Sequence, residues 1–215
     1  MFRYSGSGET LLRIPSFELA AGGQALLTGG SGTGKSTLLH LILGLMEPSS
    51  GEIRVAGRAI HKLHGEARDR FRGRHVGMVF QTFQLLHGFS ALENVMLAMT
   101  FSDIKPGEHE ERARELLDRL GIERTGAPPE ALSVGQQQRV AVARALACGP
   151  ELVLADEPTA SLDPENGRAA VGLLREVCRE RGAALLCVSH DPTLAGEFDE
   201  VHGLASLSVA EGARV

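Results

Sequence analysis

The segment at residues 29–36 constrains this 215-residue chain more than any other feature. It reads Gly-Gly-Ser-Gly-Thr-Gly-Lys-Ser and fits the pattern G-x-x-x-x-G-K-S/T at every position. A short apolar run, Gln24 to Thr28, precedes it, and residues 35–44 are expected to form a buried helix that a glycine closes. Because the pattern forms a phosphate-binding loop between a strand and a helix, the sequence predicts such a loop here.

Phosphate oxygens concentrate negative charge and need several hydrogen-bond donors close together. Glycines let the backbone curl so that successive N–H groups point inward, and the following helix presents its positive end. Lys35 is expected to reach the β- and γ-phosphates, and the Ser36 hydroxyl to bind Mg²⁺. A flexible turn with an incidental lysine is the alternative, which the flanking strand and helix disfavour. The candidate phosphate-loop residues are Gly29, Gly30, Ser31, Gly32, Thr33, Gly34, Lys35, Ser36 and Thr37.

An acidic pair follows a second apolar run. Residues 152–155 predict a buried strand, and Asp156 and Glu157 come at its carboxyl end, where parallel α/β sheets place their ligands. Asp156 is expected to hold Mg²⁺ through water, and Glu157 to orient or activate the attacking water. Two acids alone would more often be a helix cap or a solvated turn. With the phosphate loop they predict nucleoside-triphosphate hydrolysis, but not what the hydrolysis drives.

The spacing of apolar residues predicts an α/β fold with a helical insertion. The strand candidates at residues 152–155 and 185–188 are apolar throughout, and a helix at 164–181 separates them, which indicates a parallel sheet covered on both faces. Between residues 82 and 149 the period is helical, most clearly at 110–120. The first third contains short extended segments, among them 11–19, which Pro15 interrupts.

Composition makes several other classes of protein poor candidates. The net charge is −5, with 27 acidic and 22 basic residues and no long basic run, so generic nucleic-acid binding is not expected. The longest apolar stretches fall short of the roughly 18 residues that cross a membrane, and the first ten residues lack the apolar core of a secretory signal. The chain is therefore expected in the cytosol unless a partner carries it to a membrane.

Residues 132–139, which read Leu-Ser-Val-Gly-Gln-Gln-Gln-Arg, resemble the signature sequence of ABC ATPases. Gln81, the Ser-Leu-Asp at 161–163 and His190 resemble the family's Q-loop, D-loop and switch histidine, in the family's order. The matches extend from residue 4 to residue 190. The resemblance implies a P-loop NTPase core with a mostly parallel sheet, an N-terminal antiparallel β part and an inserted helical subdomain.

The resemblance also implies a single domain over residues 1–215, with no room for a regulatory domain. Its RecA-like core and antiparallel part would take residues 1–81 and 150–215, and its helical subdomain residues 82–149. Residues 77–86 and 91–95, with the three successive glutamines, look most like the lipoprotein-release and macrolide-export subfamily.

The resemblance further implies that ATP bound to the phosphate loop of one copy is covered by the signature of a second copy. The family usually has glycine where this chain has Val134, but an active enzyme is expected. The implied catalytic residues are Lys35, Gln81, Glu157 and His190; the metal-binding residues are Ser36, Gln81 and Asp156; and the further nucleotide or interface residues are Tyr4, which would stack on adenine, Ser133, Gly135, Gln136 and Asp163.

The implied cofactors are ATP and Mg²⁺, and the implied partners are a second copy on ATP binding and integral membrane permease subunits, with no nucleic acid. The chain would then lie at the cytoplasmic face of the inner membrane. Phe83, Leu85, Leu86 and Phe89 would either anchor the permease or pack internally. An ABC-type ATPase of a cell-division or other non-transport membrane complex is the alternative. A relative acting on DNA or the ribosome would usually carry coiled-coil insertions or two cassettes, and neither is present.

Overall fold

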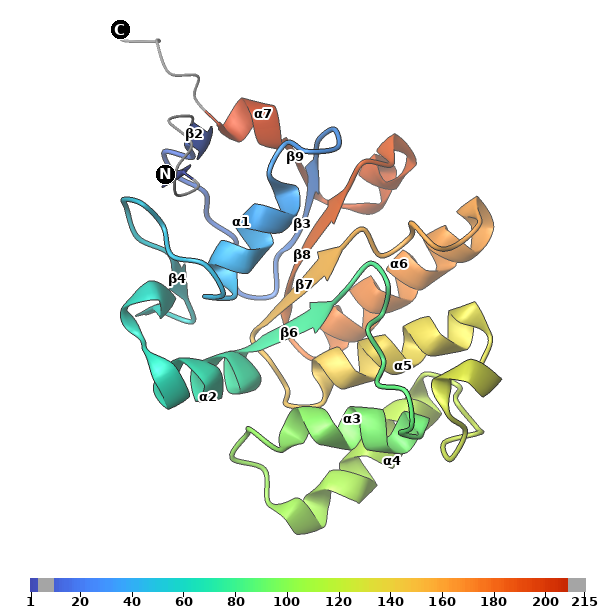
Figure 1. The fold of residues 1–215 in the computed structure, drawn as a ribbon. Coiled ribbons are helices and arrows are strands. Elements are labelled where there is room, and N and C mark those ends of the chain that lie inside the picture. The colour runs from blue at the N-terminus through green and yellow to red at the C-terminus, as the bar shows by residue number, and fades with distance from the viewer. Residues whose placement is uncertain (4–9, 209–215) are drawn as a thin grey trace, which may run out of the picture.

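A parallel sheet forms the centre of the computed structural model, which describes residues 1–3 and 10–208 (Figure 1). The strand order is β6-β7-β8-β3-β9, and every neighbouring pair is parallel. The strands are β3 (Gln24–Thr28), β6 (Val76–Val79), β7 (Leu152–Asp156), β8 (Ala184–Ser189) and β9 (Glu200–Gly203). This arrangement confirms the predicted α/β class. Strand β9 had no signal in the sequence, because it lies at the sheet edge and lacks an apolar run.

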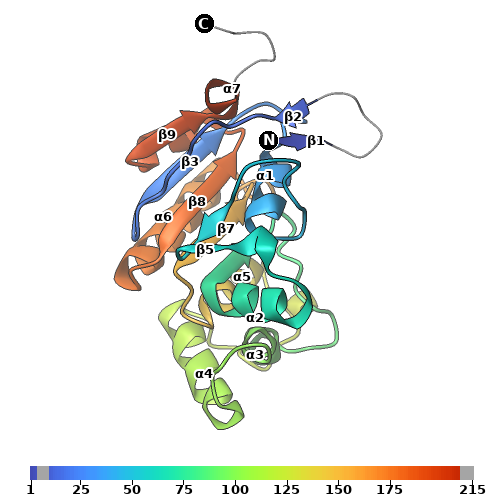
Figure 2. The ribbon, with the colours of Figure 1, turned by 90° about the vertical axis from the view of Figure 1, so that its left-hand side faces the viewer.

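Helices cover both faces of the sheet, which explains why its inner strands are largely apolar. The successive residues Leu26 and Leu27 point to opposite faces and belong to two different apolar clusters, and both are fully buried. On the Leu27 face lie α1 (Lys35–Ile42) and α2 (Gly65–His75), and on the Leu26 face lie α5 (Val134–Leu146) and α6 (Pro164–Glu180) (Figures 1 and 2).

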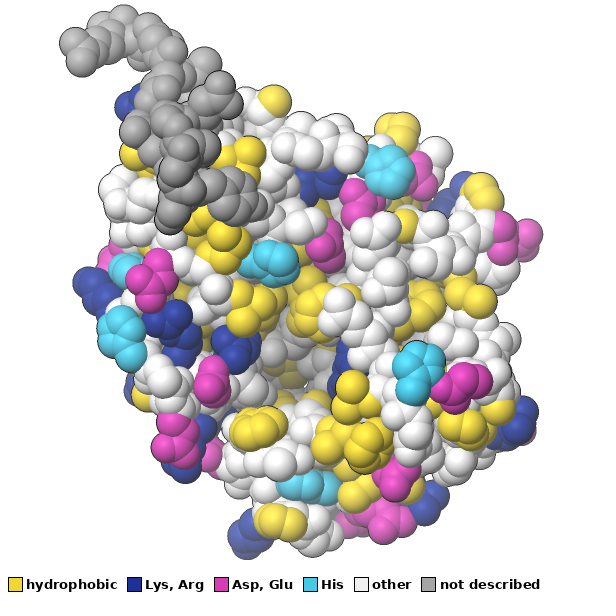
Figure 3. All heavy atoms as spheres, in the orientation of Figure 1, with side chains coloured by type: hydrophobic (Ala, Val, Ile, Leu, Met, Phe, Trp, Pro, Cys, Tyr) yellow, Lys and Arg dark blue, Asp and Glu magenta, His cyan; other side chains and the backbone are white. Residues whose placement is uncertain are grey.

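Helix α2 contributes one buried side chain, Phe71, and most of its other side chains are charged. Figure 3 shows Lys and Arg side chains interspersed with Asp and Glu side chains on this side of the molecule. Ion pairs join Arg70 to Glu66 and Arg72 to Asp69 along the helix. A helix with so narrow an apolar face gives no periodic signal, and the sequence did not predict it.

Residues between β6 and β7 form three helices: α3 (Ala91–Met99), α4 (His109–Arg119) and α5. Helices α3 and α4 lie beyond the β6 edge of the sheet, next to α5, which covers the sheet near that edge (Figures 1 and 2). One apolar cluster extends from them into the sheet, and a Cβ atom on Gly77 of β6 would lie only 2.2 Å from the Ala145 carbonyl oxygen of α5. Helix α5 therefore packs against the sheet at a contact that admits only glycine.

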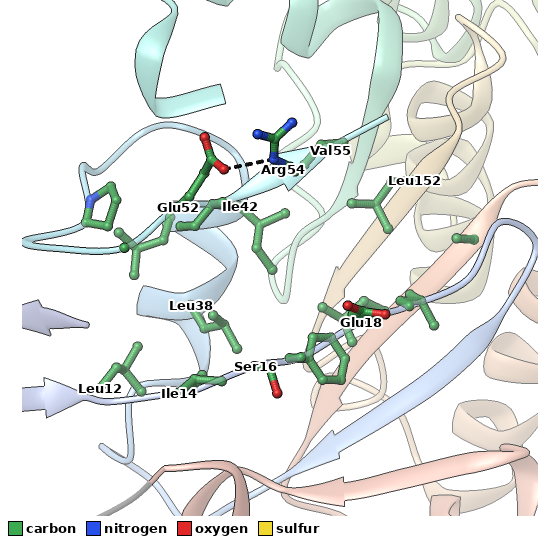
Figure 4. A pocket seen from close by; sticks show the side chains of 18 of the residues that line it. Leu12, Ile14, Ser16, Glu18, Leu38, Ile42, Glu52, Arg54, Val55 and Leu152 are labelled. Atoms are coloured by element: carbon green, nitrogen blue, oxygen red, sulfur yellow. Dashed lines mark hydrogen bonds and ion pairs between the residues drawn. The ribbon is translucent and has the colours of Figure 1, made fainter. Parts of the chain in front are cut away.

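Two short antiparallel pairs lie beside α1: β1 (Phe2–Arg3) with β2 (Thr10–Leu12), and β4 (Arg54–Val55) with β5 (Arg58–Ala59). The expected strand at residues 11–19 ends at Leu12, because Pro15 has no N–H to donate to a ladder. A pocket of about 640 Å³ separates residues 12–21 from 51–57, and its lining is largely apolar (Figure 4).

The remaining elements are short. They are the terminal helix α7 (Leu204–Leu207) and the 3₁₀ turns Ile60–Lys62, Pro106–Glu108, Pro129–Ala131 and Pro192–Glu197. Within residues 1–3 and 10–208, no helix combines the length and apolarity that crossing a membrane requires.

Candidate active site

The glycine-rich segment forms the loop between β3 and α1, and its backbone needs the glycines. Gly32 and Gly34 have φ of 75° and 98°, in the left-handed region that side chains disfavour. A Cβ atom on Gly29 would lie 2.8 Å from the Thr33 hydroxyl oxygen. No described side chain caps the N-terminus of α1, so its first N–H groups are available to an anion.

Lys35, the first residue of α1, folds back over this loop. Its ammonium nitrogen donates hydrogen bonds to the carbonyl oxygens of Gly29 at 2.8 Å and Gly30 at 2.9 Å. It also lies 3.4 Å from Oε1 of Glu157, and both side chains are largely buried. The positive charge is thus held between the phosphate loop and the acidic end of β7.

Three successive residues at the carboxyl end of β8 hold Glu157. Its backbone N–H donates to the Val188 carbonyl at 2.9 Å. Its Oε2 accepts from the Ser189 hydroxyl at 3.2 Å and from the His190 backbone N–H at 3.1 Å, and it lies 2.8 Å from His190 Nδ1. A carboxylate can only accept, so we assign a proton to Nδ1. Glu157 also has a left-handed φ of 46°, which costs roughly 1 kcal/mol in a non-glycine residue and is typical of functional positions.

Asp156 ends β7 in surroundings that suit a magnesium ion. Burial raises the pKa of its carboxyl group, a hydrogen bond with Ser36 opposes this rise, and the charge of Glu157 adds to it. Among the described residues, Asp156 Oδ1 is the one buried side-chain nitrogen or oxygen that lacks a hydrogen-bond partner. An unpaired carboxylate oxygen beside a serine hydroxyl fits Mg²⁺, which uses few protein oxygens and completes its shell with phosphate and water.

The carboxyl ends of β3, β6, β7 and β8 meet around one cleft of about 740 Å³. Gln81 reaches it directly after β6, and Leu11, which the sequence did not single out, lines it from β2. The structure thus brings the phosphate loop together with three of the predicted residues from elsewhere in the chain. The cleft is lined by Leu11, Gly30, Ser31, Gly32, Gly34, Lys35, Ser36, Thr37, Gln81, Glu157 and His190.

The signature residues lie outside this cleft, at the N-terminus of α5. Ser133 is the N-cap: its hydroxyl accepts from the Gln136 N–H at 3.2 Å, and the Gln136 side chain accepts from the Ser133 N–H at 2.9 Å. Val134 is 47% exposed, and a Cβ atom on Gly135 would meet no described atom within 4 Å. These residues therefore face away from the packing of their own chain.

Asp163 also lies outside the cleft, as the N-cap of α6. Its carboxylate accepts from the Asn166 backbone N–H at 3.1 Å and from the Asn166 side chain at 2.6 Å, and these bonds lower its pKa. Tyr4, the residue predicted to stack on adenine, lies outside the described residues.

The comparisons with known proteins decide the family. The family model described as "ABC transporter" matches residues 12–160, which is more than half of the chain. Over 192 residues the chain is 44% identical to the lipoprotein-releasing system ATP-binding protein LolD of Maricaulis maris, covering 89% of this chain and 84% of that protein. The chain belongs to the ABC transporter family.

Two further ABC relatives extend the comparison. The chain is 41% identical over 199 residues to the macrolide export ATP-binding/permease protein MacB of Salmonella typhimurium, with 91% of this chain but 31% of MacB covered. A dimeric, post-hydrolysis structure of the ATP-binding cassette MJ0796 bound to ADP and Pi superposes with a TM-score of 0.80 and 33% identity, covering 93% of this chain and 89% of that one. The chain is thus an ATP-binding and ATP-hydrolysing cassette, and the predicted resemblance and fold are confirmed.

Two side chains, Arg144 and Asn94, hold the loop after Gln81 in this ABC cassette, and the sequence analysis gave neither of them this role. Arg144 of α5 donates to the Phe83 and Gln84 carbonyl oxygens, both at 2.6 Å, and burial lowers its pKa. Phe83 and Gln84 adopt left-handed φ of 57° and 49°. Asn94 of α3 accepts from the Leu86 N–H at 2.7 Å. An arginine among apolar residues near the end of α5 was the available cue.

Proposed function

We propose that the chain powers a membrane transporter by closing, as a head-to-tail homodimer, on two ATP molecules. The observation that carries this proposal is the separation of the two phosphate-binding regions. The cleft holds the phosphate loop, Gln81, Glu157 and His190, whereas the signature helix presents its N-terminus outside the cleft. A second copy, turned to face the first, would place its Ser133 over the cleft.

The cleft residues suit phosphoryl transfer to water. The phosphate-loop N–H groups, the N-terminus of α1 and Lys35 would bind the β- and γ-phosphates and stabilise charge that develops in the transition state. Bound by Ser36 and Asp156, Mg²⁺ would neutralise further phosphate charge. The contacts with the end of β8 direct Glu157 toward the loop. There its carboxylate would orient the attacking water and accept a proton from it. Gln81 would contact the metal or the attacking water. His190 would contact the γ-phosphate.

Gly135 supports a role for the signature at the partner's nucleotide. Packing within the described chain does not demand glycine there, since a Cβ atom would meet no atom within 4 Å. Glycine is favoured where a ligand approaches the backbone closely. The free helix end would offer N–H groups and a positive dipole to the γ-phosphate. The structures of the MJ0796 cassette, at 33% identity, are dimeric, which supports the pairing of two copies.

We infer that a permease docks on Leu86 and Phe89. Of the four apolar residues that follow Gln81, Phe83 and Leu85 are buried, whereas Leu86 and Phe89 are 49% and 40% exposed. Hydrophobic side chains gather on this face over α3 and the loop before it (Figure 3). The Asn94 bonds to Leu86 and Phe89 hold the loop that carries both anchors. Docking would place the chain at the cytoplasmic face of the inner membrane.

Affinity purification from native membranes tests this assignment. The wild-type chain is expected to recover a polytopic permease, and a double substitution of Leu86→Asp with Phe89→Asp is expected to lose it while ATP binding is retained. Leu45→Asp is the matched control, because Leu45 is an exposed leucine on another part of the surface. Equal recovery by the double variant would eliminate the docking site. Recovery of a division or other non-transport complex would favour the alternative function.

We also infer that the chain is one domain, with residues 82–149 as its helical subdomain and residues 1–81 and 150–215 as its core. The packing of α5 on β6 and the apolar cluster shared by α3, α4, α5 and the sheet support a single domain.

A further inference from the structure

Ser189 is a fully buried polar residue at the end of β8, in contact with Glu157. Its hydroxyl oxygen lies 3.0 Å from the Asp191 backbone nitrogen and 3.2 Å from Glu157 Oε2. A backbone N–H can only donate, so the hydroxyl must accept from Asp191. The hydroxyl's single proton is therefore directed to the carboxylate of Glu157.

The two oxygens of Glu157 have different surroundings. Oε2 accepts hydrogen bonds from the Ser189 hydroxyl, the His190 backbone N–H and His190 Nδ1, whereas Oε1 lies 3.4 Å from the Lys35 ammonium nitrogen. Fixing Oε2 sets the plane of the carboxylate and leaves Oε1 toward the phosphate loop. The His190 ring is exposed and would also contact the γ-phosphate. The Ser189 hydroxyl is buried, so it is the side-chain donor whose proton goes to Glu157 alone.

We propose that Ser189 is a positioning residue for ATP hydrolysis: its hydroxyl holds the Glu157 carboxylate in the orientation that presents Oε1 to the attacking water. This role presupposes that Glu157 acts on that water, as proposed above. Ser189 does not line the cleft among the described residues, so it acts through Glu157 and not on the nucleotide.

Steady-state ATPase kinetics and ATP-binding titrations on the intact chain test this role. Ser189→Ala removes a hydrogen bond to a charged group, so kcat is expected to fall about tenfold while KM and the Kd for ATP stay within about twofold. Ser189→Thr keeps the hydroxyl and is expected to retain most of kcat. Cys187→Ala is the matched control, because it also removes one heavy atom from a fully buried side chain of β8, and it should keep kcat.

Wild-type turnover by Ser189→Ala would overturn the role of Ser189. An equal loss in Cys187→Ala, or a parallel loss of ATP affinity in Ser189→Ala, would show a packing defect instead and overturn it as well. Glu157→Gln, measured beside these variants, separates the role proposed for Glu157 from the role proposed for Ser189. If Glu157→Gln turns over normally, the function proposed for Glu157 fails; if it is inactive while Ser189→Ala is normal, only the role of Ser189 fails.

Discussion

The cleft and the N-terminus of α5 both offer helix-end N–H groups to an anion, but their surroundings differ. In the cleft, Lys35 and Glu157 are buried and contact each other, the phosphate loop and the end of β8. At α5, Ser133 and Gln136 contact each other, and the described chain leaves the space beside Gly135 open. The side chains of the cleft are held by contacts within their own chain, whereas we propose that the N-terminus of α5 contacts the nucleotide of a second copy.

Lys35→Ala is expected to have the largest effect on ATP turnover, because it removes the positive charge of Lys35 from the cleft. ATP turnover should fall about 10³-fold, the scale of losing a transition-state charge contact in a buried site. Lys62→Ala, on an exposed lysine paired with Glu52, should leave turnover unchanged in the same phosphate-release assay. If Lys35→Ala turned over ATP within tenfold of the wild type, the cleft would not depend on the charge of Lys35, contrary to the comparison above.

Two glycine substitutions on or beside α5 separate packing from nucleotide contact. Gly77→Ala would force a Cβ atom against the Ala145 carbonyl and should lower the free energy of unfolding by about 3 kcal/mol. Gly135→Ala meets no atom within 4 Å, so its stability should stay within about 1 kcal/mol while turnover falls. Chemical denaturation and ATPase assays check both. An unchanged turnover in Gly135→Ala would mean that the open space faces no nucleotide.

Two N-cap serines provide a sharper pair. Ser133 and Ser90 both form capping boxes, on α5 and α3, so alanine at either position should cost about 1 kcal/mol of stability. Turnover should fall about tenfold in Ser133→Ala, because this variant would lose the contact that we propose with the partner's nucleotide, and it should stay at the wild-type level in Ser90→Ala. Equal turnover in the two variants would mean that Ser133 caps α5 and has no contact with the nucleotide.

Asp156→Asn is expected to have a small effect on stability, and it should stabilise the protein, whereas the substitutions above destabilise it or leave it unchanged. Because the folded-state pKa of Asp156 is raised, its contribution to stability is greatest at low pH and is lost as pH rises through that pKa. Without Mg²⁺ or nucleotide at neutral pH, the variant should melt higher by about 2 °C, although it should lose Mg²⁺-dependent turnover. Thermal melts across pH check the sign, and a lower melting temperature in the variant would contradict it.

The sequence predicted those parts of the fold that carry a local signal. Strand β3 has the predicted bounds, Gln24–Thr28, and α6 differs from its prediction by one residue, because continuous or periodic apolar residues mark both. Helix α2 carries one buried side chain and β9 is an edge strand, so neither has such a pattern.

For the site, the same contrast holds between local and distant contacts. The phosphate loop is one continuous motif, and the structure brings it to Gln81, Glu157 and His190 as the family resemblance implied; their roles stay predictions. The contacts of Ser189 with Glu157 and of Arg144 with Phe83 join residues 32 and 61 positions apart. No spacing rule links such pairs before the chain is folded.

Sedimentation of Glu157→Gln with and without saturating ATP tests the central claim, that two copies complete each other's sites, most directly. With hydrolysis slowed, ATP is expected to convert this variant from one chain to a particle of two. Adding Ser133→Arg should keep the chain single while its ATP affinity is unchanged. A single chain in both variants at saturating ATP, or equal pairing in both, would contradict the claim.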